Sequence, residues 1–334
     1  MTSPSSPIAE SAGPVRIVCV GCGYWGQNLI RNFLALDRAH VLGFCRADAA
    51  RLAAMRDEHP SARLYPGLDA VVGDADVQAV VIATPAPTHY ALARRALEAS
   101  KHVFVEKPMT LAAAEAAELV ALAEEQRRVL LVGHLLEYAP AVRTLKAALD
   151  AGRIGRLRHL HMERLKLGKV RSEENVLWSF APHDLSVAGF LLGPQARPAS
   201  VRAAGWCHIQ SGIEDIVHLN LEYPEGVTSH LHVSWLHPET RRFVVLVGEE
   251  GMLVWDDTAR QDKVALHRKA IDVATLATSD KGAEPLVLDD AEPLRLECEH
   301  FLSCILDGTP PVSDGRDGLR VVETLERATQ ALRA

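Results

Sequence analysis

The first part of the chain alternates short apolar runs with segments in which apolar residues recur at helical spacing. This alternation is typical of a parallel α/β sheet, in which strands buried on both faces read as continuous apolar runs. The predicted strands are 15–20, 41–45, 77–83, 103–105 and 129–132. The predicted helices begin after residue 23 and at residues 49, 88 and 111.

Beyond residue 136 the pattern changes to longer strands in which apolar and polar residues alternate. Residues 217–221 and 229–235 alternate in this way on either side of a Pro-Glu-Gly turn, which predicts an antiparallel hairpin. Further strands are predicted at 242–247, 252–255 and 264–267, and helices at 140–150, 293–306 and 318–332. We therefore predict an α/β Rossmann domain over 15–136 and, over 137–334, an α+β domain with a large, mostly antiparallel open sheet.

A glycine-rich loop follows the first strand directly. It reads Gly21-Cys-Gly23-Tyr24-Trp25-Gly26 and opens the first helix, which is the context of a dinucleotide-binding loop. In such a loop the first glycine allows the tight turn, the second lets the backbone approach the pyrophosphate, and the third lets helix and strand pack closely. The alternative is a glycine turn without a ligand.

The end of the second predicted strand bears on the choice between NAD and NADP. An acidic residue there normally holds the adenosine ribose, but this chain has Arg46 at that place. An arginine removes the repulsion toward a 2′-phosphate and can pair with it, which favours NADP. The alternative is that Arg46 is solvated and that Asp48 or backbone groups hold the ribose of NAD.

Composition and charge exclude several classes of protein. The chain has 334 residues, of which 48% are hydrophobic and 24% charged, as in ordinary globular proteins. A formal charge of −7 argues against nucleic-acid binding, which needs a concentrated basic face. No apolar run is long enough to span a membrane. Residues 1–14 are rich in Ser, Pro and Ala and are predicted to be a disordered tail rather than a signal peptide, so we expect a cytoplasmic protein with reduced cysteines.

Two further motifs follow predicted strands, at the edge where a doubly wound sheet binds its ligand. One contains Thr84, Pro85 and His89, and the other is Glu106-Lys107-Pro108. Together with the glycine loop they resemble the Gfo/Idh/MocA family, named for glucose-fructose oxidoreductase, inositol dehydrogenase and a rhizopine-catabolism protein. The resemblance runs from residue 15 to the last helix. It implies an NAD(P)-dependent oxidoreductase acting on a ring hydroxyl of a sugar, with both motifs beside the cofactor.

The resemblance implies that Lys107 lies near the nicotinamide and the reacting hydroxyl. A partly desolvated lysine beside a cationic nicotinamide has a lowered pKa, so it can polarise a hydroxyl or exchange its proton. The alternative is a solvated lysine at a strand end.

His183, in the stretch Trp178-Ser-Phe-Ala-Pro-His183-Asp184, resembles the family's general acid/base. Family members commonly have an aspartate four residues earlier on the same helical face, where this chain has Ser179. Without that carboxylate the protonated imidazole gains less charge stabilisation, although it can still accept a proton. The alternative is a structural histidine that caps a helix.

Residues 166–183 are similar to family members that act on nucleotide-linked amino sugars, such as UDP-N-acetylglucosamine 3-dehydrogenases. Lys166, Lys169 and Arg171 can neutralise a substrate diphosphate, or belong to a solvated loop. The other predicted substrate-binding residues are His134, Tyr138, Asn175, Trp178 and Asp184. Two alternative functions remain open, namely a dehydrogenase of inositol or free hexoses and a non-catalytic nicotinamide-binding sensor.

Histidines recur on the polar face of two predicted strands. His159 and His161 share a face with Glu163, and His230 shares one with His232. Such residues can bind a metal, but no third-ligand motif accompanies either group, so no metal is predicted. We instead expect a polar sheet face, and the resemblance implies a homodimer or homotetramer formed through it.

Overall fold

A computed structural model describes residues 13–46, 48–168 and 170–333. Most of the predicted tail, and Lys169, lie outside the described residues. The chain forms two compact units. The first comprises residues 1–110, 115–133 and 294–315, and the second comprises 111–114, 134–293 and 316–334.

The first unit contains a six-stranded sheet. Its strands are β1 (Val15–Val20), β2 (Ala39–Cys45), β3 (Arg63–Tyr65), β4 (Ala79–Ile82), β5 (His102–Glu106) and β6 (Leu130–Gly133). Their order in space is β3-β2-β1-β4-β5-β6, and every neighbouring pair is parallel. This is the strand order of the Rossmann fold, which confirms the fold predicted for this part of the chain.

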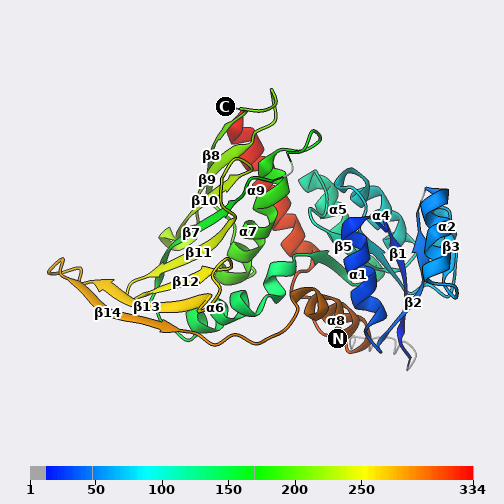
Figure 1. The fold of residues 1–334 in the computed structure, drawn as a ribbon, viewed down its shortest axis with the longest axis horizontal. Coiled ribbons are helices and arrows are strands. Elements are labelled where there is room, and N and C mark those ends of the chain that lie inside the picture. Colours follow the sequence, from blue (N-terminus) through cyan, green and yellow to red (C-terminus); the bar gives the residue numbers. More distant parts are fainter. Residues whose placement is uncertain (1–12, 47, 169, 334) are drawn as a thin grey trace, which may run out of the picture. The chain divides into compact units, whose positions relative to one another are not determined.

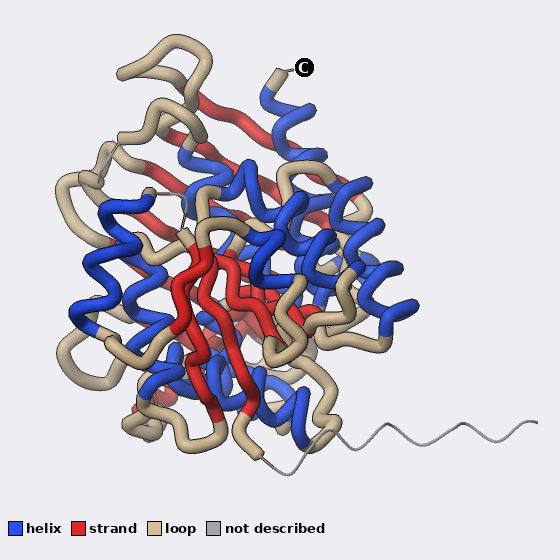
Figure 2. The backbone as a smooth tube through the Cα atoms, turned by 90° about the vertical axis from the view of Figure 1, so that its right-hand side faces the viewer, coloured by secondary structure: helices blue, strands red, loops and turns tan. Residues whose placement is uncertain are grey.

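Helices lie on either side of this sheet (Figure 2). They are α1 (Tyr24–Leu34), α2 (Ala49–Glu58), α3 (Leu68–Val72), α4 (His89–Glu98) and α5 (Ala113–Gln126), with a 3₁₀ turn η1 (Ala86–Thr88) before α4. Helix α1 contacts β1 and β2, and α4 contacts β4 and β5. The strands are therefore covered on both faces, which explains why they read as uninterrupted apolar runs.

Helix α8 (Pro293–Leu306) belongs to the first unit, although the sequence analysis placed it in the second domain. Its Phe301 ring packs edge-on against Phe33 and Phe104, with centroid distances of 6.3 and 5.7 Å. The segment after α8 extends the contact, because Ser313 Oγ donates to the carbonyl of Val132 on β6 at 2.7 Å. The apolar stripe of α8 was predicted correctly, but not the sheet on which it packs.

The second unit contains an eight-stranded sheet with the order β14-β13-β12-β11-β7-β10-β9-β8. The strands are β7 (Leu157–Leu165), β8 (Ser200–Trp206), β9 (Ile216–Glu222), β10 (Thr228–Ser234), β11 (Arg241–Gly248), β12 (Met252–Asp256), β13 (Val264–Ile271) and β14 (Thr278–Pro285). Only the β7–β10 pair is parallel. The large, mostly antiparallel open sheet was therefore predicted correctly.

One face of this sheet packs against helices (Figure 1). These helices are α6 (Pro140–Asp150) and α7 (Val176–Leu192), and α9 (Gly315–Leu332) lies alongside α7. The 3₁₀ turn η2 (Leu135–Tyr138) precedes α6, and the 3₁₀ turn η3 (Pro224–Gly226) precedes β10. Leu160, Leu219 and Leu231 point to this side and are almost fully buried. The opposite face carries no helix in the described part of the chain. None of the described helices combines the length and apolar character needed to cross a membrane.

Candidate functional site

A cavity of about 540 Å³ opens at the carboxyl ends of β1, β2 and β4. Its walls come from the glycine loop, the end of β2, the loop after β4 and the start of α3. The lining residues are Val20, Gly21, Cys22, Gly23, Cys45, Arg46, Asp48, Pro66, Gly67, Leu68, Ala83, Thr84, Pro85, Thr88 and Leu92. Ligands of doubly wound sheets bind at this edge, so the cavity lies where a dinucleotide is expected.

The three glycines of the loop have the geometry that their predicted roles require. Gly21 has a φ of +93°, and a Cβ there would lie 2.6 Å from the carbonyl oxygen of Ala83. A Cβ on Gly26 would lie 2.0 Å from the carbonyl oxygen of Gly21, so any side chain would separate α1 from the loop. A Cβ on Gly23 would meet nothing within 4 Å, which leaves the backbone open to a ligand. The loop therefore fits a dinucleotide pyrophosphate at the N-terminus of α1.

Arg46 lies at the wall of the cavity, directly after β2. Its Nη1 donates to the carbonyl of Cys22 at 2.9 Å, which ties the guanidinium to the glycine loop. Asp48 also lines the cavity, so both residues that the sequence analysis weighed are present. A cationic group held here can pair with a 2′-phosphate on the adenosine ribose.

The glycine loop and the Glu106-Lys107-Pro108 motif are connected through side chains. Trp25 Nε1 donates to the carboxylate of Glu106, and the backbone N–H of Lys107 donates to the same carboxylate at 3.3 Å. The indole of Trp25 therefore has a protein partner, and the cofactor contact predicted for this residue of the glycine loop stays a prediction. Tyr24, in contrast, is 91% exposed, so its predicted cofactor contact stays a prediction.

Gly133 makes room for the Glu106 carboxyl group. A Cβ at Gly133 would lie 3.0 Å from the Glu106 carboxylate, because β5 and β6 pair Glu106 with Gly133. The sequence analysis did not single out Gly133 as part of the site. The available signal was a glycine at the end of an apolar run, where a larger residue is common.

His89 begins α4 and is 1% exposed. Its Nε2 lies 2.8 Å from the carbonyl oxygen of Thr84, and its Nδ1 lies 2.8 Å from that of Pro108. Thr84 and Pro85, which belong to the motif predicted to lie beside the cofactor, line the cavity. His89 is not among the residues that line it. Both ring nitrogens of His89 therefore face backbone carbonyls, and its predicted contact with the cofactor stays a prediction. The peptide bond between Lys107 and Pro108 is cis.

Helix α7 of the second unit carries the other predicted catalytic residue. Ser179 and His183 lie one turn apart on this helix, as the spacing predicted. Asn175 caps the helix by accepting from the Trp178 N–H at 3.1 Å, and the Trp178 indole donates to Thr329 at 3.0 Å. Asn175 and Trp178 therefore have structural partners, and their predicted substrate contacts stay predictions.

Asp184 holds α7 to the sheet. Its carboxylate accepts from Arg164 Nε at 2.7 Å and from Nη2 at 2.9 Å, and its side chain is 2% exposed. A buried bidentate ion pair of this kind occupies both carboxylate oxygens. Asp184 therefore has a structural partner, and its predicted contact with substrate stays a prediction.

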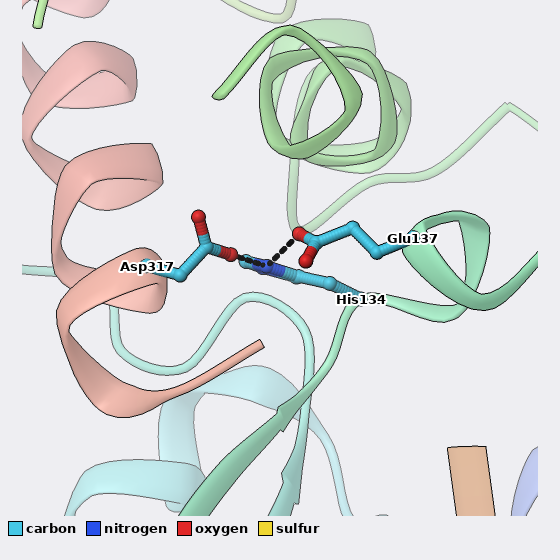
Figure 3. A group of neighbouring side chains, drawn as sticks. All are labelled: His134, Glu137 and Asp317. Atoms are coloured by element: carbon cyan, nitrogen blue, oxygen red, sulfur yellow. Dashed lines mark hydrogen bonds and ion pairs between the residues drawn. The ribbon is translucent and has the colours of Figure 1, made fainter. Parts of the chain in front are cut away.

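A buried cluster lies where η2 meets the start of α9 (Figure 3). His134 Nδ1 lies 2.5 Å from Asp317 Oδ2 and 3.4 Å from Glu137 Oε1, and Arg320 Nη2 donates to Asp317 Oδ1 at 2.6 Å. His134 and Tyr138 were predicted to line the substrate crevice. They are 1% and 0% exposed, and their predicted contact with substrate stays a prediction.

Burial and the neighbouring charges together shift the pKa values of His134 and Glu137. Burial by itself would lower the pKa of His134, but the charge of Asp317 and the hydrogen bonds to both carboxyl groups raise that pKa to about 10. Burial and the neighbouring Asp317 charge raise the pKa of Glu137. Among the described residues, this group also has the donor types and spacing of a metal site. However, Arg320 Nη2 and His134 Nδ1 each contact one oxygen of the Asp317 carboxylate, so both of these oxygens already have partners in the protein.

Lys166 and Arg171 lie in the loop before α7, and both are exposed. Arg171 Nε is 3.0 Å from Glu174 Oε1, which is a surface ion pair. Their predicted contact with a substrate diphosphate stays a prediction.

The face of the eight-stranded sheet that carries no helix is called the outer sheet face here. It carries six partly exposed histidines, namely His159, His161, His218, His230, His232 and His267. The rings of His218 and His232 stack with centroids 4.1 Å apart, and those of His161 and His230 with centroids 5.5 Å apart. Partial burial lowers the pKa of His232 to about 4, so the ring is neutral at neutral pH.

Comparison with known proteins agrees with this architecture. Residues 15–134 match a family model described as an oxidoreductase family with an NAD-binding Rossmann fold, and residues 142–254 match the GFO/IDH/MocA C-terminal domain. The chain is 29% identical over 327 residues to UDP-N-acetylglucosamine 3-dehydrogenase from Acidithiobacillus ferrooxidans, which covers 96% of this chain and 98% of the relative.

A solved structure of that Acidithiobacillus enzyme superposes with a TM-score of 0.81 at 28% identity, over 96% of this chain and 98% of that one. An oxidoreductase structure from Magnetospirillum magnetotacticum MS-1 has a TM-score of 0.82 at 30% identity, over 94% and 99%. Inositol 2-dehydrogenase 1 from Saccharopolyspora erythraea is 32% identical over 66% of this chain and 67% of its own. The cavity at the glycine loop, the two-unit fold and these relatives together place the chain in the Gfo/Idh/MocA family of NAD-binding sugar and polyol oxidoreductases.

Proposed function

We propose that this enzyme transfers a hydride between a nicotinamide cofactor and C3 of a nucleotide-linked amino sugar such as UDP-N-acetylglucosamine. The observation that carries the proposal is the match to UDP-N-acetylglucosamine 3-dehydrogenase over 96% of the chain. The presence of both Lys107 and His183 supports a catalytic role over a sensor, because a module that only binds the cofactor needs neither proton-transferring group.

Separate groups of residues would bind the cofactor and move the proton of the sugar hydroxyl. The glycine loop and Arg46 hold the cofactor, which when bound accepts or returns the hydride. In the oxidation, the C3–H bond breaks as the hydride leaves, and the C3–OH proton passes to His183 while Lys107 Nζ holds the developing oxyanion. The products are a 3-keto sugar, the reduced cofactor and one proton. In the reduction the same residues return the proton to the carbonyl oxygen.

A substrate panel followed by absorbance of the reduced nicotinamide tests this function. We expect turnover with UDP-N-acetylglucosamine and much less with free N-acetylglucosamine, because the nucleotide supplies binding energy. Turnover restricted to myo-inositol or free hexoses would establish the alternative substrate class. Tight cofactor binding without turnover of any compound in the panel would establish the sensor.

We infer that NADP is the preferred cofactor, and Arg46 provides a test. A 2′-phosphate paired with the guanidinium loses a charge-assisted hydrogen bond in Arg46→Ala, so we expect the Kd for NADPH to rise by about 10-fold or more. The Kd for NADH, which lacks that phosphate, should change by less than about threefold and serves as the control. Both constants follow from the fluorescence of the bound reduced cofactor. NADH binding at least as tight as NADPH binding in the unmodified enzyme would contradict the inference.

We also propose that two or four copies of the chain assemble through the outer sheet face. Val245 and Val247 lie on this face beside the histidines, and each is only partly exposed. The apolar side chains favour covering this face, and its Glu163 carboxylate is already paired with Arg241, so covering the face protects the sheet. An isologous contact would place each face against its own copy.

Acid should weaken this assembly. Burial already lowers the pKa of His232 to about 4 in the single chain, and covering the face with a second copy would lower that pKa further. Protonating the ring therefore costs more free energy in the assembly than in the separated chains, so assembly is weakened as the pH falls through about 4, where the ring of the separated chain takes up its proton. Light scattering after gel filtration should give an oligomer at pH 7.5 and at pH 5, and smaller species near pH 4. In His232→Gln this dissociation should need a lower pH, and a monomer at pH 7.5, or the same dissociation in both proteins, would refute the proposal.

A further inference from the structure

The ring of His89 joins two segments that the sequence separates. Its Nε2 lies 2.8 Å from the carbonyl oxygen of Thr84, in the wall of the cofactor cavity. Its Nδ1 lies 2.8 Å from the carbonyl oxygen of Pro108, in the turn that begins with Lys107. The imidazole is rigid and 1% exposed, so the separation of the two carbonyls is fixed by one ring.

We propose that His89 is a positioning residue, whose ring holds the Lys107–Pro108 turn at a set distance from the Thr84 wall of the cofactor cavity. The significance for catalysis rests on the proposed function of Lys107. A displacement of about 1 Å in a reacting group can cost about 100-fold in rate, so a ring that fixes the turn would matter for the hydride-transfer step. His89 itself touches neither cofactor nor substrate in this account.

Both carbonyl oxygens can only accept, so a neutral ring, which carries one N–H, donates to one of them, and only a protonated ring donates to both. The two contacts also differ in what they reach. The contact with Thr84 anchors the ring to the cavity wall, whereas the contact with Pro108 reaches the turn that carries Lys107. The Glu106 carboxylate holds the other side of this turn by accepting from the Lys107 N–H at 3.3 Å. Losing the Pro108 contact should therefore release the turn on one side, while losing the Thr84 contact should leave it attached to α4.

Two amide variants separate these contacts. The amide nitrogen of asparagine can replace Nδ1 as a donor, so His89→Asn keeps the contact with Pro108 and loses the one with Thr84. The longer His89→Gln places its amide nitrogen near Nε2, so it keeps the contact with Thr84 and loses the one with Pro108. A neutral ring donates to only one of the two carbonyls, so the change in Tm of each variant is measured beside its kcat.

We expect His89→Asn to retain at least about a third of kcat and His89→Gln to lose about 10- to 100-fold. The KM for the sugar and the Kd for the reduced cofactor should change by less than about threefold in both. Equal kcat values for the two variants, or kcat values that simply follow Tm, would overturn the proposal and leave His89 a structural residue.

Hydrogen exchange provides a readout that needs no substrate. Peptides that cover residues 107–112 should exchange faster in His89→Gln than in His89→Asn, with peptides of β1 and β6 unchanged in both. Equal exchange in the two variants would also overturn the proposal. If the unmodified enzyme turns over no sugar, the proposed function fails, yet the exchange measurement still decides whether the ring holds the turn.

Discussion

Replacing Lys107 by alanine is expected to lower kcat by about 100- to 10,000-fold, because this is the range that a positioned proton-transferring group contributes. The ammonium group is the one that would stabilise the oxyanion formed at the sugar as hydride leaves. Glu106 and Trp25 hold the backbone before it through the Glu106 carboxylate, so the loss of the side chain beyond Cβ should leave the cavity wall intact. Stopped-flow absorbance of the reduced nicotinamide measures the hydride-transfer step directly.

Three controls make the Lys107 result specific. Lys107→Arg keeps a positive charge, but its larger planar guanidinium cannot take the position of the ammonium group, so it should restore substrate binding and only a small part of kcat. Lys146→Ala removes a surface lysine that is paired with Asp150 and should leave kcat unchanged. The loss of kcat in His183→Ala should lie in the same range as the loss in Lys107→Ala. Near-normal turnover in Lys107→Ala with a good substrate would exclude the mechanism.

Much of the fold could be predicted because its determinants are local. The glycine loop, the apolar strands and the alternating strands each depend on residues that are near one another in the sequence. Strand β14 escaped prediction for the same reason. All eight of its residues are exposed, so Thr278–Pro285 has no apolar alternation that would indicate a strand.

The candidate site was only partly predictable because side-chain partners come from distant segments. His134 and Asp317 are separated by 183 positions, and no pattern around either residue indicates the other. His89 and Asp184 have the residue types of a binding site, and the sequence does not reveal that backbone carbonyls and Arg164 already occupy their polar atoms. Burial decides between a binding and a structural role, and burial depends on the assembled fold.

The second large effect is expected at the buried cluster of Figure 3. Asp317→Asn should lower the free energy of unfolding by about 3 to 5 kcal/mol, because it leaves the charges of His134 and Arg320 buried without their counter-ion. The matched variant Glu137→Gln removes a carboxyl group whose pKa burial already raises. The glutamine amide replaces a protonated carboxyl group, so the free energy of unfolding should change by less than about 1 kcal/mol. Urea denaturation at pH 7 measures both.

The pH dependence gives the cluster a distinguishing test. The pKa of His134 is raised to about 10, whereas that of an unfolded histidine is about 6.5. The stability from this ion pair is therefore fully present below pH 6.5 and is lost as the pH rises through the folded pKa. In the unmodified chain the unfolding free energy should decline between about pH 6.5 and 10, and in Asp317→Asn this decline should largely disappear. An equal alkaline decline in both proteins would mean that His134 is neutral in the folded chain, and that the short contact with Asp317 is a hydrogen bond between a neutral ring and a carboxylate rather than an ion pair.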